Sequence, residues 1–404
     1  MTHDKGRIVI NSPYTEPTQH LKYIGEGHFD IEQGRRRSGF WIESKNEKRE
    51  FYPIELVNMI RPLVKSWRES GNPECTNITR ELLSHWHDRT VREDTPFFWC
   101  QIEAIETLIF LAETHSGVMF GDDGSPFKRI CTKLCTGGGK TIVMSMLIAW
   151  QVCNFANSPT DKRYTRNFLV VAPNLTVKKR LEVLLPNVDG NYYAKFSIVP
   201  ESMRAILNQA RILIHNWQAL DDDSIIDPAK NKSVVKMPPR SDDSFSRKII
   251  GDMHNIIVIN DEAHHAYRYR PEDRKPKTQE EKENQREATV WITGLDRIHK
   301  EREIMRCYDF TATPFVPGRE KDNDRGLFSW IVSDFSLDDG IEAGIVKTPR
   351  IIVRDNTPPD SVTGKSDLYH IYPKVKDDLN TTKNPNAPLP ELVRNAYELL
   401  GHDW

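Results

Sequence analysis

Short apolar runs recur along the middle of the chain, and stretches with helical periodicity or high polarity separate them. The runs that read as strands cover residues 130–135, 168–172, 210–215, 256–260 and 304–310. Apolar strands that alternate with helical stretches are typical of a mostly parallel sheet, because the crossover helices cover both of its faces. The pattern therefore predicts an α/β domain over residues 96–345, with helices on both faces of the sheet.

The first 95 residues have a different pattern, which predicts an accessory α+β region ahead of the main domain. Two stretches there, residues 55–67 and 77–86, place apolar side chains at helical spacing, although Pro62 interrupts the first. Three consecutive arginines, Arg35 to Arg37, stand close to two aromatic residues. Such a cluster suits phosphate contacts with base stacking, and it also suits an ordinary solvated hairpin, so both interpretations stay open.

Two polar stretches interrupt the α/β pattern and read as surface insertions. Residues 221–247 are rich in Asp, Ser, Lys and Pro, and residues 267–303 are dominated by Arg, Lys and Glu. The second stretch is expected to contain solvated helical segments. Residues 346–404 read as a strand, a linker rich in Pro, Asp and Asn, and a terminal helix from about Leu389.

A glycine-rich turn joins the apolar run at residues 130–135 to a long apolar helical stretch. The turn consists of Thr136, Gly137, Gly138, Gly139, Lys140 and Thr141. Glycines let backbone N–H groups close around phosphate oxygens, and the following helix N-terminus adds further donors. Lys140 can reach the outer phosphates, and the Thr141 hydroxyl can ligate Mg²⁺. Because Leu134 stands where the full motif has its first glycine, a plain turn that caps a core helix is the alternative.

Polar residues at the ends of other predicted elements complete a nucleotide site. Gln101, upstream of the turn, begins a helical stretch and could pair with an adenine edge, because its amide both donates and accepts. Asp261 and Glu262 directly follow an apolar run; Asp261 can hold the Mg²⁺ shell, and Glu262 can orient and deprotonate the attacking water. The hydroxyls of Thr311 and Thr313, after the last run, could hydrogen-bond this acidic pair and sense its state.

Two strand ends carry residues that suit contacts with nucleic acid. Pro173 and Thr176 follow one apolar run, and Lys178 lies in the first turns of the helix after it. Asn216 and Trp217 follow the next run, at the edge where ligands bind in open α/β sheets. On each segment alone, a plain connection between strand and helix explains the pattern equally well.

Overall charge and cysteine content narrow the class of protein. The net charge of −2 gives no global attraction to nucleic acid, so any such surface is expected to be local. Six scattered cysteines and a polar beginning favour a reduced, cytoplasmic protein without a zinc site or a membrane span. Asp30, Glu43 and Lys45 resemble the acidic pattern of metal-dependent nucleases, but such spacings are frequent in charged chains, and surface charges are the favoured interpretation.

Taken together, these blocks resemble the motifs of superfamily 2 helicases and translocases. The matching segments are Gln101 for the adenine-reading glutamine, residues 136–141 for Walker A, 172–176 for the first nucleic-acid motif, 261–264 for the D-E-A-H box and 311–313 for the coupling motif. Within that superfamily, the T-G-G-G-K-T, A-P-N-L-T-V, D-E-A-H-H and T-A-T-P blocks most resemble the helicase part of type III restriction enzyme Res subunits and related restriction endonucleases.

That resemblance implies a RecA-like P-loop domain that hydrolyses ATP with Mg²⁺, in which Lys140, Asp261 and Glu262 are catalytic and His264, Thr311 and Thr313 couple hydrolysis to movement. It implies double-stranded DNA as the track, restriction as the use and a DNA methyltransferase subunit as a possible partner. Relatives carry a second RecA-like domain with an arginine finger, and often a nuclease domain, which this sequence does not show. The chain is therefore expected to be the front part of a larger protein and to hydrolyse ATP very slowly by itself. A remodelling helicase outside restriction and an ATP-gated module without catalysis remain alternatives.

Overall fold

The protein divides into two compact units in its computed structural model, Met1–Val346 and Lys347–Trp404. The described residues are 8–25, 28–43, 49–92, 96–114, 117–119, 121, 123–221, 241–270, 273, 275–319, 326–347, 375 and 388–402. In the second unit the structure describes helix α11 (Glu391–His402), which agrees with the helix expected from about Leu389. The strand expected near residue 350 and most of the polar stretch at residues 221–247 lie outside the described residues.

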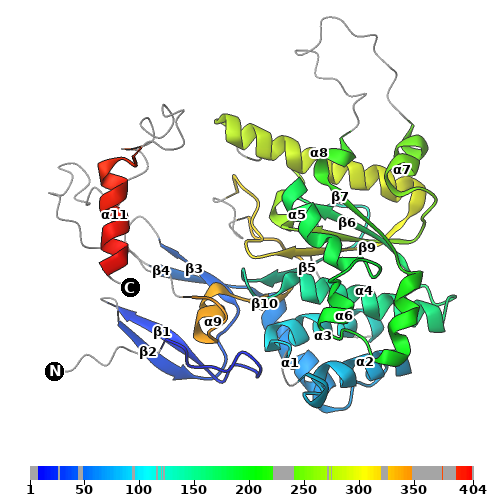
Figure 1. The fold of residues 1–404 in the computed structure, drawn as a ribbon, viewed down its shortest axis with the longest axis horizontal. Helices are drawn as coiled ribbons and strands as arrows, with labels where there is room; N and C mark the ends of the chain where they lie inside the picture. Colours follow the sequence, from blue (N-terminus) through cyan, green and yellow to red (C-terminus); the bar gives the residue numbers. More distant parts are fainter. Residues whose placement is uncertain are drawn as a thin grey trace, which may run out of the picture. The chain divides into compact units, whose positions relative to one another are not determined.

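A six-stranded parallel sheet forms the centre of the first unit (Figure 1). Its spatial order is β10 (Ile331–Phe335), β5 (Arg129–Leu134), β9 (Ile304–Thr311), β8 (Ile256–Asp261), β6 (Asn167–Ala172) and β7 (Arg211–Asn216). All neighbouring pairs are parallel. Each apolar run of the sequence is a strand of this sheet, which confirms the predicted α/β fold class. The additional strand β10 was not predicted.

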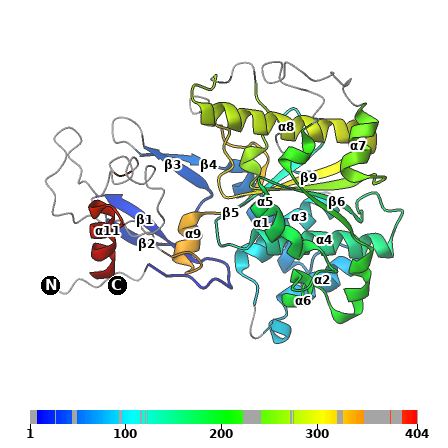
Figure 2. The same cartoon turned by 45° about the horizontal axis from the view of Figure 1, so that its top comes forward.

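Helices cover both faces of the sheet, as the apolar strands require (Figures 1 and 2). One core cluster joins Phe168 and Val170 of β6 to α3 (Trp99–Glu113) and α4 (Lys140–Asn157). The other cluster joins the intervening residues Leu169 and Val171 to α7 (Asp242–Ile250) and α8 (Gln279–Arg302). This alternation follows from the two-residue period of a strand.

Helix α8 corrects the expectation that residues 267–303 form a solvated insertion. Trp291, Leu295 and Ile298 are buried against the sheet, and the Trp291 indole N–H donates to the Asn260 side-chain oxygen at 3.0 Å. Most charged residues of the helix lie outside this buried stripe, with Glu287 as a buried exception. Because 24 residues carry only one apolar stripe, their composition resembles that of a solvated segment.

The N-terminal region is α+β, as predicted, and shares the core of the main domain. It contains hairpin strands β1 (Gln19–Gly25) and β2 (His28–Gln33), hairpin strands β3 (Gly39–Glu43) and β4 (Arg49–Pro53), and helices α1 (Glu55–Glu69) and α2 (Asn77–His87). Pro62 lies inside α1 without ending it. Ile60 of α1 and Leu82 of α2 are fully buried in the same cluster as α3 and α4.

Short helices complete the described part of the first unit. They are α5 (Leu175–Arg180), α6 (Tyr192–Lys195) and α9 (Leu337–Glu342), with 3-10 helices at Thr90–Arg92, Leu181–Leu184, Glu201–Gln209, Trp217–Leu220 and Ala263–His265. No described helix is long and apolar enough to cross a membrane.

The arginine cluster of the N-terminal region is used for structure. Arg35 makes a two-pronged ion pair with Glu103 of α3, and Arg36 pairs with Glu342 of α9. Arg37 pairs at the surface with Glu55, at 2.7 Å. Neither interpretation of the sequence, a phosphate patch or a solvated hairpin, anticipated the paired guanidinium groups of Arg35 and Arg36.

The residues of the nuclease-like pattern are only partly among the described residues. Asp30 lies on the exposed strand β2, while Lys45 and the side chain of Glu43 lie outside the described residues. Across the described ranges, no three His, Cys, Asp or Glu side chains gather in a way that could hold a metal ion. All six cysteines are free and buried.

Candidate active site

The glycine-rich turn connects β5 to α4 in a conformation that only glycine adopts without strain. Gly137 and Gly139 have φ values of +85° and +87°, in the left-handed region. A Cβ atom on Gly139 would lie 2.1 Å from the Gln101 side-chain nitrogen, so the loop also packs too closely for a larger residue. Helix α4 begins at Lys140, directly after this loop.

Lys140 and Glu262 meet at the carboxyl edge of the sheet. The Lys140 Nζ atom lies 2.9 Å from the Glu262 Oε1 atom, although the two strands that lead to them, β5 and β8, are separated by β9. Parallel strands end at one edge, which explains how residues so distant in sequence come together. The structure therefore brings together the ammonium and carboxylate groups that the sequence assigned to one site.

The acidic pair has the electrostatics of a site prepared for a cation. Asp261 is only 1% exposed, and its pKa is raised by burial and by the neighbouring Glu262 carboxylate, against the opposing effect of Lys140 and Arg180. Glu262 has a left-handed backbone, with φ +50°. A non-glycine residue in that region costs about 1–3 kcal/mol, and such residues gather at functional sites.

His264 links this edge to the neighbouring strand β9. Its Nδ1 atom lies 2.9 Å from the Thr311 hydroxyl oxygen and 3.6 Å from the Glu262 carboxylate. Burial, together with His265, lowers the pKa of His264 to about 4, so the imidazole is neutral at pH 7. The Thr313 N–H donates to the same Thr311 hydroxyl at 3.1 Å. The structure thus connects His264, Thr311 and Thr313 to one another. The contact with the acidic pair comes from His264, whereas the prediction had the threonine hydroxyls make it.

Gln101 lies against the loop, and both ends of its buried amide have partners. Its Oε1 atom accepts from the Phe98 N–H at 3.0 Å, and its Nε2 atom donates to the Gly138 carbonyl at 3.1 Å. The structure therefore shows Gln101 bracing the loop from the start of α3. For the predicted pairing with adenine, the Gln101 Oε1 or Nε2 atom would have to form a second hydrogen bond, or the side chain would have to move.

The predicted nucleic-acid residues divide into two groups. Thr176 and Lys178 lie on α5, and Asn216 ends the adjacent strand β7, so these three share the carboxyl edge of the sheet. Pro173 lies in the turn between β6 and α5. Trp217, in contrast, is partly buried against the cluster that contains α8, which gives it a packing role in this structure.

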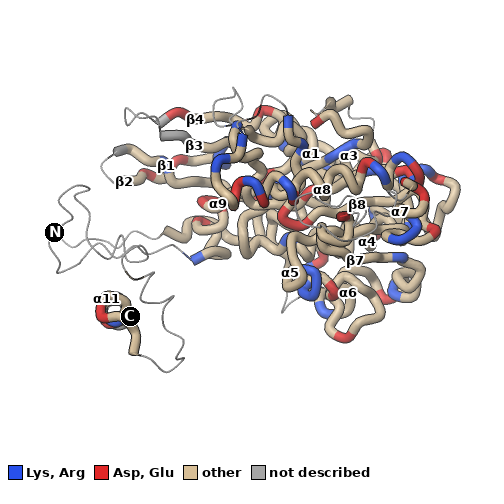
Figure 3. The backbone as a smooth tube through the Cα atoms, turned by 90° about the horizontal axis from the view of Figure 1, so that it is seen from above, with Lys and Arg blue, Asp and Glu red and all other residues tan. Residues whose placement is uncertain are grey.

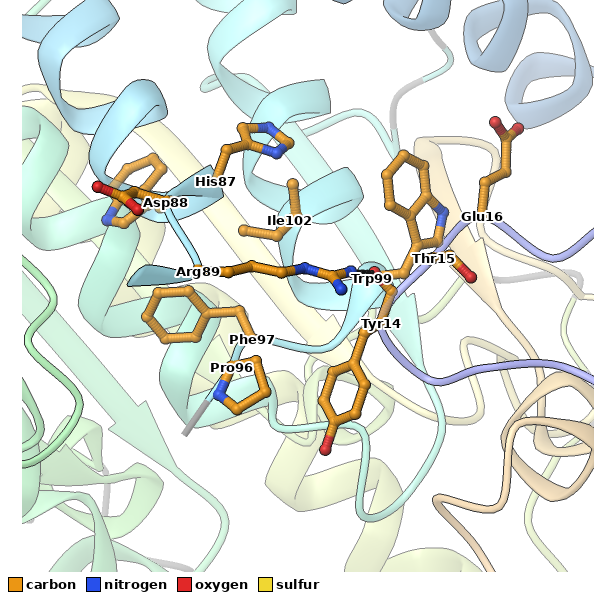
Figure 4. Close-up of a pocket in the computed structure, with 11 residues that line it drawn as sticks. Tyr14, Thr15, Glu16, His87, Asp88, Arg89, Pro96, Phe97, Trp99 and Ile102 are labelled. Carbon is orange, nitrogen blue, oxygen red and sulfur yellow. Dashed lines mark hydrogen bonds between the residues drawn. The ribbon is translucent and has the colours of Figure 1, made fainter. Parts of the chain in front are cut away.

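A pocket of about 260 Å³ lies beside the start of α3, and Ile102 of this helix is one of the residues that line it (Figure 4). Tyr14, Phe97 and Trp99 supply aromatic walls, and Arg89 extends through its middle. The Arg89 guanidinium donates to the Tyr14 carbonyl at 3.0 Å, which ties the N-terminal segment to this wall. Gln101 and the glycine loop are not among its lining residues.

One contact at the edge was not assigned from the sequence. The Arg180 guanidinium lies 3.5 Å from the Asp261 Oδ2 atom. Arg180 lies two positions after Lys178, and no local signal in the sequence connects it to a carboxylate 81 positions away.

The residues present fit a magnesium nucleotide. The described donors suited to Mg²⁺ are the Asp261 carboxylate and the Thr141 hydroxyl, and Mg²⁺ is usually held by one or two carboxylates together with substrate phosphates. The glycine conformations leave the loop without side chains where a phosphate would approach, and Lys140 lies at its end. These features are the ones that a triphosphate-binding site requires.

One comparison with known proteins matches the part of the chain that contains these residues. The family model described as "Type III restriction enzyme, res subunit" matches residues 95–316, which contain the glycine loop, the acidic pair and the coupling residues. Among solved structures, the UvsW helicase from Bacteriophage T4 is 14% identical, with a TM-score of 0.30, over 72% of this chain and 80% of that chain. A likeness this weak supports no conclusion about activity. No curated protein matches the chain. From its family match, the chain belongs to the family of the res subunit of type III restriction enzymes, with a helicase-like motor domain of RecA type.

Proposed function

We propose that this chain is the ATP-hydrolysing part of a motor that moves on double-stranded DNA in a restriction-type enzyme. The observation that carries the proposal is the 2.9 Å contact between Lys140 and Glu262 at the mouth of the glycine loop. A site that only binds a nucleotide does not need a carboxylate beside the phosphate-binding lysine. A site that hydrolyses the nucleotide needs one to orient and deprotonate the attacking water.

Binding of ATP would separate the Lys140–Glu262 pair before hydrolysis. Lys140 would turn to the outer phosphates of ATP, where its charge stabilises the transferring phosphoryl group. Glu262, relieved of its cation, would accept a hydrogen bond from the attacking water and then its proton. Asp261 and Thr141 would hold Mg²⁺, which would neutralise charge on the phosphate oxygens.

His264 would transmit the change at Glu262 to Thr311. It contacts both residues through the same ring nitrogen, Nδ1, so Thr311 and Glu262 compete for one atom of the imidazole. A change in the position of Glu262 would therefore alter the hydrogen bond that reaches β9 and the Thr311–Thr313 turn.

The family resemblance supports the further proposals of a role in restriction, a nuclease, a methyltransferase partner and DNA as the track. The basic turn of α5 on the carboxyl edge supports a local surface for the DNA backbone (Figure 3). An arginine finger supplied by a second motor domain is worth about 10³ to 10⁵ in rate, so turnover measured without such a domain is expected to be slow.

The proposal is tested by steady-state ATP turnover with and without a DNA duplex. We expect slow, magnesium-dependent hydrolysis that Lys140→Ala and Glu262→Gln each reduce by about 10² or more, because each removes a group that acts on the transition state. Lys162→Ala, which removes an exposed lysine away from the site, is the matched control. Turnover that survives Glu262→Gln would contradict the assignment of the base, and turnover that survives Lys140→Ala would exclude the loop as the phosphate site.

A further inference from the structure

Arg180 lies between helix α5 and the acidic pair that follows strand β8, at the carboxyl edge of the sheet. It is the last residue of α5, and its side chain is 62% exposed. Its guanidinium nevertheless lies 3.5 Å from Asp261, whose side chain is 1% exposed. The metal-binding carboxylate therefore contacts a cation that belongs to the helix expected to face DNA.

The other basic residues of α5 lack this contact. Neither Lys178 nor Lys179 lies within ion-pair distance of a carboxylate among the described residues, and Lys179 is exposed. Strands β6 and β8 are neighbours, with Val171 opposite Asn260, so the helix that follows β6 starts close to the acidic pair that follows β8. Topology therefore places α5 within reach of the carboxylate, and Arg180 is the residue that reaches it.

The ion pair between Arg180 and Asp261 is weak enough for Arg180 to exchange Asp261 for another anion. An ion pair with one exposed partner is weak, because water screens it and a long side chain is immobilised in it. Arginine also matches phosphate oxygens in two-pronged geometry, which makes a DNA phosphate a strong competitor for the same guanidinium. While Arg180 stays on Asp261, it opposes the approach of a second cation to that carboxylate.

We propose that Arg180 is a positioning residue that exchanges between Asp261 and a DNA phosphate, so that DNA binding at α5 releases Asp261 to hold Mg²⁺. The inference rests on the proposed function, since it assigns the DNA contact and the magnesium ligand to one motor. It makes binding of DNA and binding of magnesium nucleotide cooperative. By thermodynamic linkage, each ligand then strengthens the other by the same factor.

The test measures this coupling directly. A fluorescent, non-hydrolysable ATP analogue is titrated at several Mg²⁺ concentrations, with and without a saturating short duplex, and DNA binding is followed separately by anisotropy. For the unmodified chain we expect the duplex to tighten magnesium-nucleotide binding by at least about fivefold, at the low end of measured couplings. Without magnesium the duplex is expected to have little effect.

Arg180→Ala is expected to tighten magnesium-nucleotide binding in the absence of DNA and to reduce the effect of the duplex to less than about twofold. Lys178→Ala and Lys179→Ala remove the same charge from the same helix. They are expected to weaken DNA binding but to keep the coupling once the duplex is saturating. Arg180→Lys retains the charge without the two-pronged geometry and is expected to restore part of the coupling. Thermal melts establish that the variants are folded.

The outcomes separate the inference from the proposed function. Full coupling in Arg180→Ala, or an equal loss in Lys178→Ala, would overturn the role of Arg180. Magnesium-nucleotide binding that DNA does not change in the unmodified chain would overturn the exchange, although the nucleotide site would stand. Binding that does not depend on magnesium, or that persists in Lys140→Ala, would instead overturn the proposed function.

Discussion

The chain contains two short basic clusters that look alike in sequence and have opposite uses in the structure. In the N-terminal cluster, Arg35 and Arg36 are mostly buried and engaged by Glu103 and Glu342. In the α5 cluster, Lys178 and Lys179 have no carboxylate partner among the described residues, and Arg180 is largely exposed. A basic run thus becomes structural or available according to the carboxylates that the fold places opposite it.

The N-terminal cluster anchors the accessory region to the elements that carry the active site. Glu103 lies two positions after Gln101 on α3, so the Arg35 pair fixes the helix that braces the glycine loop. Close by, Asp334 of β10 accepts from the Ser38 hydroxyl at 2.6 Å and pairs with Lys133 of β5. The boundary expected near residue 95 is therefore crossed by buried ion pairs and by shared core residues.

The largest expected effect is on the stability of this anchor. Arg35→Ala leaves the buried Glu103 carboxylate without its main partner, and breaking a buried pair in this way costs about 3–5 kcal/mol of unfolding free energy. Arg37→Ala removes an exposed pair with Glu55 and is expected to cost less than about 1 kcal/mol. Urea denaturation of both variants measures the difference. Equal losses would show that the first cluster is no more structural than a surface pair.

The second expected effect is on the salt dependence of DNA binding. If Lys178 and Lys179 contact phosphates, replacing both with alanine makes the negative slope of log K against log salt shallower by about 2, because each contact contributes about −0.9. Arg37→Ala serves again as the control and is expected to leave the slope unchanged. Anisotropy titrations between low and moderate salt give the slopes. A slope that does not change in the double variant would remove α5 from the DNA surface.

The smallest expected effect is on stability at mildly acidic pH, where the two regions differ. Burial raises the pKa of Glu103, but Arg35, together with Arg61 and Arg68, outweighs this effect and holds the pKa below 4.5. This anchor therefore weakens only as pH falls below about 4.5. His264 has a folded pKa of about 4 against 6.5 when unfolded. Between these values the unfolded chain binds more protons, so the contribution of His264 is complete above pH 6.5 and is lost as pH falls toward 4.

Urea denaturation at pH 7.5 and 5.5 tests this difference. Replacing the imidazole in His264→Asn is expected to remove roughly 1 kcal/mol of the stability change between the two pH values, since one proton contributes about 1.4 kcal/mol per pH unit at most. His254→Asn, at an exposed histidine, is the control. Equal pH dependence in all three proteins would mean that His264 titrates as it does in solution.

The sequence predicted those parts of the molecule that depend on contiguous residues. The glycine loop, the acidic pair and the apolar strands are local patterns, and the structure contains each of them. Strand β10 was missed because Ser333 and Asp334 interrupt its apolar run, and the partners that satisfy Asp334 come from Ser38 and Lys133. Helix α8 was taken for a solvated segment because its single buried stripe is diluted by charge.

Contacts between residues that are far apart in the sequence could not be predicted from local patterns. The partners of Arg35, Arg36 and Arg180 lie 68, 306 and 81 positions away. No local spacing encodes such pairs, because they arise only when strands and helices pack. The meeting of Lys140 and Glu262 could be expected, in contrast, since both follow strands of one parallel sheet and such strands end at a common edge.

The most direct test of this account is equilibrium binding of a non-hydrolysable ATP analogue to the chain and to two single variants. The account predicts magnesium-dependent binding that Lys140→Ala weakens by about 10- to 100-fold, the worth of a charged hydrogen bond to phosphate. Glu262→Gln should bind at least as tightly as the unmodified chain, because it releases Lys140 from its ion pair. Equal binding by the unmodified chain and Lys140→Ala would contradict the central claim that Lys140 and Glu262 face one triphosphate.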